Sequence, residues 1–187
     1  MTVIAIEGRV GSGVVDVTRV VARELDLDFV DRLLLAEIAR RVGATYAEMN
    51  DSLMSSGQEL DERHFIQTTA EVIRDVAQAD NAVIVSRGAV AILRDNPNVL
   101  RVGLVANRSD RARRIISRLH FKDMEIAEQY VSQSDTAQAR YFERAFGTNP
   151  LDPFLYHVMW NLSEVSDDWA AARIIDASGA LTGRELR

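Results

Sequence analysis

Apolar residues in this chain follow two patterns: short uninterrupted runs, and longer stretches in which they recur every three or four positions. Short runs bounded by turn residues are typical of strands buried in a sheet, and the three-to-four spacing is typical of helices that bury one face. The runs predict strands at 3–6, 27–30, 81–85, 99–105 and 156–160.

The three-to-four spacing predicts helices between these strands. The second helix, over 33–42, is expected to end at Gly43, and a capping pattern formed by Thr45 and Glu48 opens the next helix. The other helices are expected at 14–25, at 61–79, from Asn107 or Ser109 to 118, twice between 120 and 146, and from Ser166 to near Gly179.

This alternation of strands and helices indicates an α/β protein whose strands form an open sheet. Roughly fifty residues of helix separate the second predicted strand from the third, far more than one crossover between parallel strands needs. We therefore expect the residues between these strands to form a lobe over the sheet edge where ligands bind.

The first predicted strand runs into a glycine-rich loop, Glu7-Gly8-Arg9-Val10-Gly11-Ser12-Gly13, which leads into the first helix. Its three glycines allow backbone conformations that other residues avoid, so that N–H groups can converge on a phosphate at the helix N-terminus. Glycine turns also join strands to helices in folds that bind no phosphate. The position at the first strand-to-helix junction favours a phosphate site.

The spacing from Gly8 to Gly13 fits the first part of the GxxxxGK[ST] motif, in which a lysine reaches the terminal phosphates and a hydroxyl holds magnesium. Val14 and Val15 stand at those two positions. Asp16 either repels the phosphates or replaces the hydroxyl as a magnesium ligand, and the sequence leaves both roles open. Metal ligands are therefore not assigned at this stage.

Charged residues follow two further strands, at the sheet edge where α/β proteins bind ligands. Asp31 and Arg32 come directly after the second strand, and Arg87 comes after the third. Asp31 also fits the N-cap position of the helix that follows, and this structural role is compatible with binding.

Three arginines, Arg111, Arg114 and Arg118, share one face of the helix after the fourth strand. Most ridges of this kind are solvated faces, but one that follows a strand end also fits a phosphate-facing role. Only one of the 22 basic residues, Lys122, is a lysine. A coding bias toward arginine explains this imbalance, and any cation that meets a phosphate is expected to be an arginine.

The composition excludes several classes of function. A net charge of −6 argues against a nucleic-acid binder that neutralises many phosphates. No segment approaches the roughly 18 apolar residues of a membrane span, and no signal sequence is recognised, so we expect a cytoplasmic protein that binds no membrane. The absence of cysteine excludes disulfides and thiolate sites. Whether the chain forms a homo-oligomer stays open.

The order and spacing of these features resemble the cytidylate kinase-like family, relatives of bacterial cytidine monophosphate kinase among the nucleoside monophosphate kinases. The resemblance covers nearly the whole chain. The matching segments are 8–13, 29–32, 83–89, the arginine helix up to Arg118, 135–142 and 156–166.

The resemblance implies a three-layer P-loop fold of the α/β class, with a five-stranded parallel sheet in a single domain over 1–187. The core of that domain would comprise 1–30, 81–119 and 151–187. A helical lobe for the nucleoside monophosphate would occupy 31–80, and a helical lid would occupy 120–150.

The resemblance also implies ATP and magnesium as cofactors and a pyrimidine nucleoside monophosphate such as CMP as the acceptor. Asp31, Arg32 and Arg87 would hold the acceptor. Arg118 and Arg140 would close on the transferring phosphate as the catalytic cations. The residues expected to bind ATP are Gly8, Arg9, Gly11, Ser12, Gly13, Val14, Val15 and Asp16.

The chain departs from the family pattern in the loop and in the lid. Val14 replaces the lysine of cytidine monophosphate kinase, and Val15 with Asp16 replaces a glycine and a hydroxyl residue. In the lid, the family arginine falls on Gln138, with Arg140 as the nearest substitute. Two further replacements are Ser86 for a glycine and His157 for an aspartate.

These departures leave two main hypotheses, a nucleotide kinase and a catalytically weak or inactive relative that keeps the fold for nucleotide sensing or partner binding. Loss of one cation aimed at the transition state lowers a rate about a hundredfold to a thousandfold, which need not abolish the reaction. A purely structural protein is a third hypothesis, in which Asp31, Arg87 and Arg118 would line a crevice without a ligand.

Overall fold

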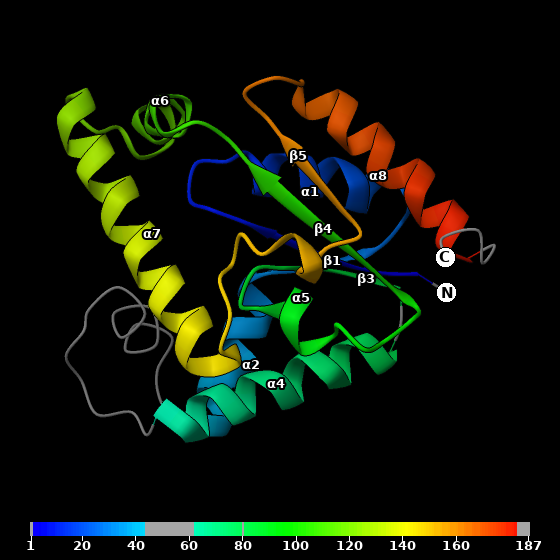
Figure 1. Ribbon diagram of the computed structural model, residues 1–187. Helices are drawn as coiled ribbons and strands as arrows, with labels where there is room; N and C mark the ends of the chain where they lie inside the picture. The colour runs from blue at the N-terminus through cyan, green and yellow to red at the C-terminus, as the bar shows by residue number, and fades with distance from the viewer. Residues whose placement is uncertain (1, 44–61, 80, 183–187) are drawn as a thin grey trace.

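The computed structural model describes residues 2–43, 62–79 and 81–182 (Figure 1). Within these residues the centre of the molecule is a five-stranded parallel sheet in the order β2-β3-β1-β4-β5. The predicted α/β class and parallel sheet are thus confirmed. The strands are β1 (Val3–Gly8), β2 (Asp28–Val30), β3 (Ala82–Val85), β4 (Val99–Val105) and β5 (Val158–Asn161).

Helices cover both faces of the sheet and one of its ends (Figure 1). On one face, α1 (Val14–Glu24) packs against α8 (Asp167–Thr182). Helix α6 (Arg108–Leu119) follows β4 and packs against α7 (Met124–Phe146), which runs back across the carboxyl ends of the strands. The other face carries α2 (Arg32–Val42), α4 (Glu62–Ala79) and the short α5 (Ala89–Ile92).

The central strand β1 divides the core into two hydrophobic clusters because its side chains alternate between the two faces of the sheet. Ile4 lies in a cluster with Val17 of α1 and Ile174 of α8. Ala5 points to the opposite face and lies in a cluster with Ile73 of α4. By the same alternation, Glu7 at the end of the strand lies on the side of Ala5, beneath α7.

Helix α7 is one helix of 23 residues, whereas the sequence predicted two helices between 120 and 146. No break occurs in this stretch. The polar segment 132–136 is helical, the Thr136 hydroxyl donates to the carbonyl of Ser132, and Asp135 pairs with arginines outside the helix. Asp123 caps the helix by accepting a hydrogen bond from the Ile126 N–H.

Three other details differ from the predicted elements. Strand β5 begins at Val158 because a 3-10 turn (Pro153–Leu155), capped by Asp152, precedes it. Helix α8 continues past Gly179 to Thr182, and α5 had not been predicted. The helix expected at Thr45 lies outside the described residues. No helix in the described part is both long and apolar enough to cross a membrane.

Candidate functional site

The glycine loop lies at the carboxyl end of β1, and its backbone requires glycine at two positions. Gly11 and Gly13 have φ angles of +78° and +89°, in the left-handed region that side chains disfavour. A Cβ atom at Gly11 would lie 2.6 Å from the Arg111 carbonyl oxygen, and one at Gly13 would overlap the guanidinium group of Arg114. The loop is therefore in close contact with α6.

The start of α1 presents backbone donors that have no partner in the described protein. The N–H groups of Gly13, Val14 and Val15 donate no hydrogen bond within the described residues, as is usual for the first turn of a helix. The Ser12 hydroxyl is buried there and also has no described partner. These donors suit an anion, because the helix dipole adds positive potential at the same point.

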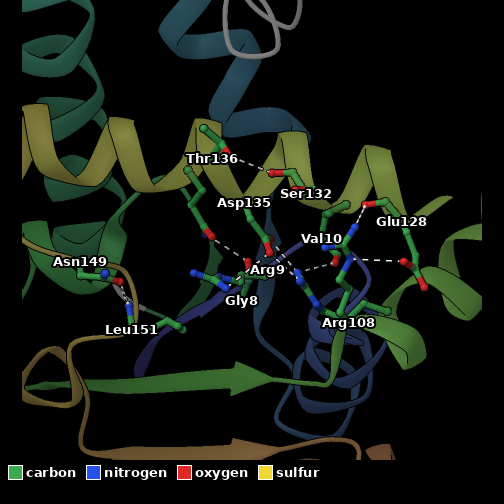
Figure 2. A network of polar contacts seen from close by, with 12 residues as sticks. Gly8, Arg9, Val10, Arg108, Glu128, Ser132, Asp135, Thr136, Asn149 and Leu151 are labelled. Atoms are coloured by element: carbon green, nitrogen blue, oxygen red, sulfur yellow. Dashed lines mark hydrogen bonds and ion pairs between the residues drawn. The ribbon is translucent and has the colours of Figure 1, made fainter. Parts of the chain in front are cut away.

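Arg111 is buried beside the loop and belongs to an ion-pair cluster with Arg9 and Asp135. Its side chain is only 4% exposed, and its two terminal nitrogens lie 2.7 and 2.6 Å from the Asp135 carboxylate oxygens. The Arg9 guanidinium approaches the same carboxylate at 3.4 Å. Figure 2 shows Asp135 pointing from α7 toward Arg9 in the loop. Asp135 thus joins α7, α6 and the glycine loop.

The other two arginines of the α6 ridge also reach the start of α1. Arg114 lies over Gly13 and makes two contacts of 2.9 Å with the Asp167 carboxylate at the start of α8. Arg118 donates to Asp16 at 2.9 Å, and both side chains of that pair are about half exposed. The ridge is therefore buried at Arg111 and partly solvated at Arg118, and each of its arginines is paired with an acid near the loop.

Glu7 is buried between β1, the end of β3 and α7. One carboxylate oxygen accepts a hydrogen bond from the Gly88 N–H at 3.0 Å, and the other accepts from the Gln138 side chain at 2.9 Å. Burial raises the pKa of Glu7 to about 7, although these two hydrogen bonds and the charge of Arg87 act in the opposite direction. This carboxyl group therefore changes its charge near neutral pH.

The structure brings Gln138 to the loop, whereas Arg140 lies on an exposed part of α7. Gln138 also donates to the Gly8 carbonyl at 3.3 Å. Among the described residues, no hydrogen bond or ion pair joins Arg140 to the loop. The proposed role of Arg140 as a lid cation stays a prediction, and this geometry does not favour it.

The residues expected to hold the acceptor lie at the carboxyl ends of β2 and β3. Arg87 has a left-handed φ of +61°, and its carbonyl accepts a hydrogen bond from the Tyr141 hydroxyl on α7. Asp31 occupies the N-cap position of α2 but makes no capping hydrogen bond with its side chain. The side chain of Arg32 lies outside the described part of the structure, so its role stays a prediction.

The two valines of the loop differ in their surroundings. Val14 is 8% exposed and lies in the core cluster shared by α1 and the sheet, and Val15 packs against the edge of that cluster. A valine side chain has no charge and no hydroxyl, so these two positions cannot make the contacts of the lysine and the hydroxyl residue in the full motif. Ser12 carries the only hydroxyl of the loop, and this side chain is buried.

Sequence reasoning missed the acidic partners of the arginines and the role of Glu7. Asp167 lay at the start of the predicted last helix without a role in the site, and Asp135 and Glu7 had appeared only as parts of longer motifs. One signal was available for Glu7, because a carboxylate directly after a run of buried aliphatic residues is unusual. Nothing in the sequence pairs Asp135 with Arg111, because the two residues come from different helices.

Comparisons with known proteins agree with this architecture. The sequence model of the cytidylate kinase-like family matches residues 3–164. Among solved structures, an uncharacterized protein from Eubacterium ventriosum ATCC 27560 is similar with a TM-score of 0.77 at 21% identity, over 96% of this chain and 99% of the other. No curated protein matches the chain.

Two further solved structures show the same fold at lower similarity. A shikimate kinase from Bacteroides thetaiotaomicron has a TM-score of 0.60 at 18% identity, over 97% of this chain and 98% of the other. The YorR protein from Bacillus subtilis, in complex with phosphorylated GDP, has a TM-score of 0.55 at 16% identity, over 96% of each chain. At these identities the likeness shows a shared fold.

Proposed function

Since the chain belongs to the cytidylate kinase-like family, we propose that it is a nucleotide kinase that transfers a phosphoryl group from ATP to a pyrimidine nucleoside monophosphate such as CMP. In this reaction an acceptor phosphate oxygen bonds to the γ-phosphorus while the bond from that phosphorus to the β–γ bridging oxygen breaks. The products are ADP and a nucleoside diphosphate. Asp31, Arg32 and Arg87 are the proposed acceptor-binding residues.

The observation that carries this proposal is the convergence of three arginines on the first turn of α1. Arg111, Arg114 and Arg118 approach the loop from one face of α6, and each is held by a carboxylate. Phosphoryl transfer depends mainly on positioning and on cations around the phosphates. Guanidinium groups suit this task because they contact phosphate oxygens through two N–H groups at once. They would take the place of the missing loop lysine.

The residues present fit the phosphates of ATP better than they fit a separate metal site. The unpartnered N–H groups at 13–15 and the guanidinium of Arg114 would hold the phosphate chain. In the described residues, no cluster of three or more acidic or histidine side chains could hold a metal ion. Magnesium in kinases needs only one or two carboxylates besides the phosphates. Asp16 fits that role once it leaves Arg118, and bound magnesium would neutralise phosphate charge.

A second candidate function is that of an inactive or slow relative that binds nucleotides without rapid turnover. Three observations favour it. Val14 is buried in the core where a kinase has a lysine, and Gln138 rather than an arginine faces the loop. In addition, the ridge arginines already have intramolecular partners, so a nucleotide must displace carboxylates before it meets these cations.

The test is an assay of the purified protein with ATP, magnesium and each nucleoside monophosphate, together with calorimetric titration of each nucleotide. A kinase gives a nucleoside diphosphate above the buffer blank, most rapidly with its own acceptor. Binding of ATP without any product would contradict the kinase proposal and support the second candidate. Absence of binding by any nucleotide would contradict both.

Two arginine variants make this assay specific. Arg118→Gln removes a proposed transition-state cation, so turnover should fall about a hundredfold or more. Its side chain is half exposed and makes one ion pair, so the fold should be retained. The matched control is Arg113→Gln on the same helix, because Arg113 is exposed and pairs only with Asp110 within α6. An equal effect of both substitutions would contradict the proposed role of Arg118.

A further inference from the structure

Glu7 and Gln138 form a buried pair beneath the phosphate loop, outside the set of residues expected to bind nucleotide. Glu7 is the only acidic side chain that is buried among the described residues. Its carboxylate joins the Gly88 N–H at the end of β3 to the Gln138 amide of α7. The same amide nitrogen donates to the Gly8 carbonyl at the start of the loop. Glu7 therefore connects both strand ends to α7.

The Gln138 side chain can form a hydrogen bond with Glu7 in either protonation state of the carboxyl group. Its amide oxygen is buried and has no described hydrogen-bond partner. A half-turn of the amide would bring this oxygen to the place of the nitrogen, where it could accept a proton carried by Glu7. The bond to the Gly8 carbonyl would then be lost, because two oxygens would face each other. A proton on the Oε1 atom of Glu7, which faces Gln138, and the hydrogen bond from Gln138 to the loop thus exclude each other.

The surroundings of Glu7 determine when it carries a proton. The charged and titratable groups that face it are Arg9 in the loop, Arg87 after β3, Tyr141 on α7 and Tyr156 after the 3-10 turn. Burial opposes the charged form more strongly than Arg87 and the hydrogen bonds favour it, so the pKa lies at about 7. A further negative charge near the loop would favour the protonated form.

We propose that Glu7 is a positioning residue whose proton occupancy rises, by at most one proton taken from solvent, when a phosphate-bearing ligand binds at residues 8–15, so that this binding strengthens as the pH falls. The inference rests on the proposed nucleotide site. An anionic ligand at the loop repels the Glu7 carboxylate, and protonation removes that repulsion. It also releases the Gly8 carbonyl from Gln138, which lets the start of the loop adjust to the ligand. By linkage, ligand and proton strengthen each other equally.

The test follows the Glu7 carboxyl carbon by NMR in protein labelled with carbon-13 at glutamate, with the signal identified by its absence in Glu7→Gln. The titration is recorded without ligand and with saturating ATP. We expect a midpoint near pH 7 without ligand and a higher midpoint with ATP. Gln138→Leu removes a hydrogen bond that favours the ionised form, so it should raise the midpoint without ligand. If Glu7→Gln does not fold, the Glu7 signal is identified instead as the one whose midpoint shifts in Gln138→Leu.

Calorimetry gives the reciprocal measurement. Between pH 6 and pH 8 the affinity for ATP should fall about threefold to tenfold more in the natural protein than in Glu7→Gln, as expected for the partly screened repulsion of one nearby charge. ATP itself takes up protons in this pH range, but this contribution is the same for both proteins and drops out of the comparison. Glu143→Gln, which alters an exposed carboxylate on α7, should behave like the natural protein.

The outcomes distinguish failure of the proton coupling from failure of the nucleotide site. Binding of ATP with an unchanged Glu7 midpoint, or with the same pH dependence in Glu7→Gln, would overturn the proton coupling and leave the nucleotide site standing. No binding of ATP at any pH would overturn the nucleotide site and the coupling with it. A raised midpoint together with the weaker pH dependence of Glu7→Gln would support both.

Discussion

Gly13 lies between the turn into α1 and the side chain of Arg114. Its φ of +89° is accessible to glycine at little cost, and the space where a Cβ would stand is filled by the Arg114 guanidinium. Arg114 is fixed in turn by Asp167 and by a weaker contact with the Leu162 carbonyl at 3.4 Å. At the scale of single residues, the geometry of the loop and the position of its nearest cation depend on each other.

Gly13→Ala should therefore destabilise the protein by about 2 kcal/mol or more. About 1 kcal/mol comes from the left-handed backbone, and the rest comes from displacing Arg114 from its carboxylate. The free energy of unfolding is measured by urea titration of the natural protein and the variant.

Gly147→Ala is the matched control for this loss. Gly147 has a φ of +63°, but no atom lies within 4 Å of the place where its Cβ would stand. Its substitution should cost only the backbone contribution, about 1 kcal/mol. Equal losses for the two glycines would show that Arg114 does not restrict the loop.

Among the elements, α7 connects the glycine loop to the rest of the molecule. One face of this helix carries Val131, Asp135, Gln138 and Phe142, spaced by three or four residues. Val131 packs on α6 and Phe142 is buried in the core cluster beneath the sheet. The two polar residues between them contact the loop. The helix is thus fixed by apolar packing at both ends and makes polar contacts with the site in its middle.

Asp135→Ala should cost about 3 to 5 kcal/mol of stability. The substitution leaves the buried Arg111 guanidinium without its carboxylate, and an unpaired buried charge is costly. Urea titration measures the loss. The combined replacement Arg111→Met with Asp135→Leu should recover most of it, since apolar residues can replace a buried ion pair without a large penalty.

Glu128→Ala provides the comparison on the same helix. Glu128 pairs with Arg108 at 3.6 Å (Figure 2), and the two side chains are 37% and 55% exposed. Exposed pairs contribute less than about 1 kcal/mol. A loss for Asp135→Ala no larger than that for Glu128→Ala would mean that the Arg111 pair does not hold α7 in place.

For the whole molecule, the parallel sheet determines which groups meet. All five strands in the described residues point the same way, so the loop after β1, the turn after β3 and the start of α6 after β4 share one edge. This arrangement places Glu7 on the inner side of that edge and covers it with α7. The burial of Glu7 therefore depends on the complete fold. Its ionisation should change the free energy of unfolding of the protein.

Glu7→Gln should change the pH dependence of unfolding. The pKa of Glu7 rises from 4.5 to about 7 on folding. Its contribution to stability is therefore fully present below about pH 4.5 and is lost as the pH rises through about 7. Relative to Glu7→Gln, the natural protein should lose on the order of 3 kcal/mol between pH 4.5 and pH 8. Urea titrations across this range measure the difference, and a constant difference would contradict the buried titration.

The sequence was sufficient to predict the sheet and the loop because both depend on local signals. The aliphatic runs that form β1 and β3 are buried on both faces, and glycine at positions 11 and 13 reflects backbone angles that other residues avoid. The arginine ridge was found from helical spacing alone. Its three members do approach the start of α1.

The acidic partners could not be predicted because they depend on how distant elements pack. Asp135 is 24 residues from Arg111, and Asp167 is 53 residues from Arg114. The sequence predicted two helices between 120 and 146, whereas α7 is one helix, and the partners of its residue Asp135 lie on other elements. The roles of Arg118, Arg140 and the acceptor-binding residues depend on ligands, so neither the sequence nor the fold alone determines them.

The pairing of the three ridge arginines with Asp135, Asp167 and Asp16 has a consequence for selectivity. These cations carry their own counter-ions, so an incoming molecule must exchange with carboxylates that belong to the chain. Small monovalent anions compete poorly with a tethered carboxylate that makes two contacts. Only a ligand with several closely spaced negative charges can replace more than one carboxylate at a time, and this requirement would keep simple salts of the cell from displacing these ion pairs.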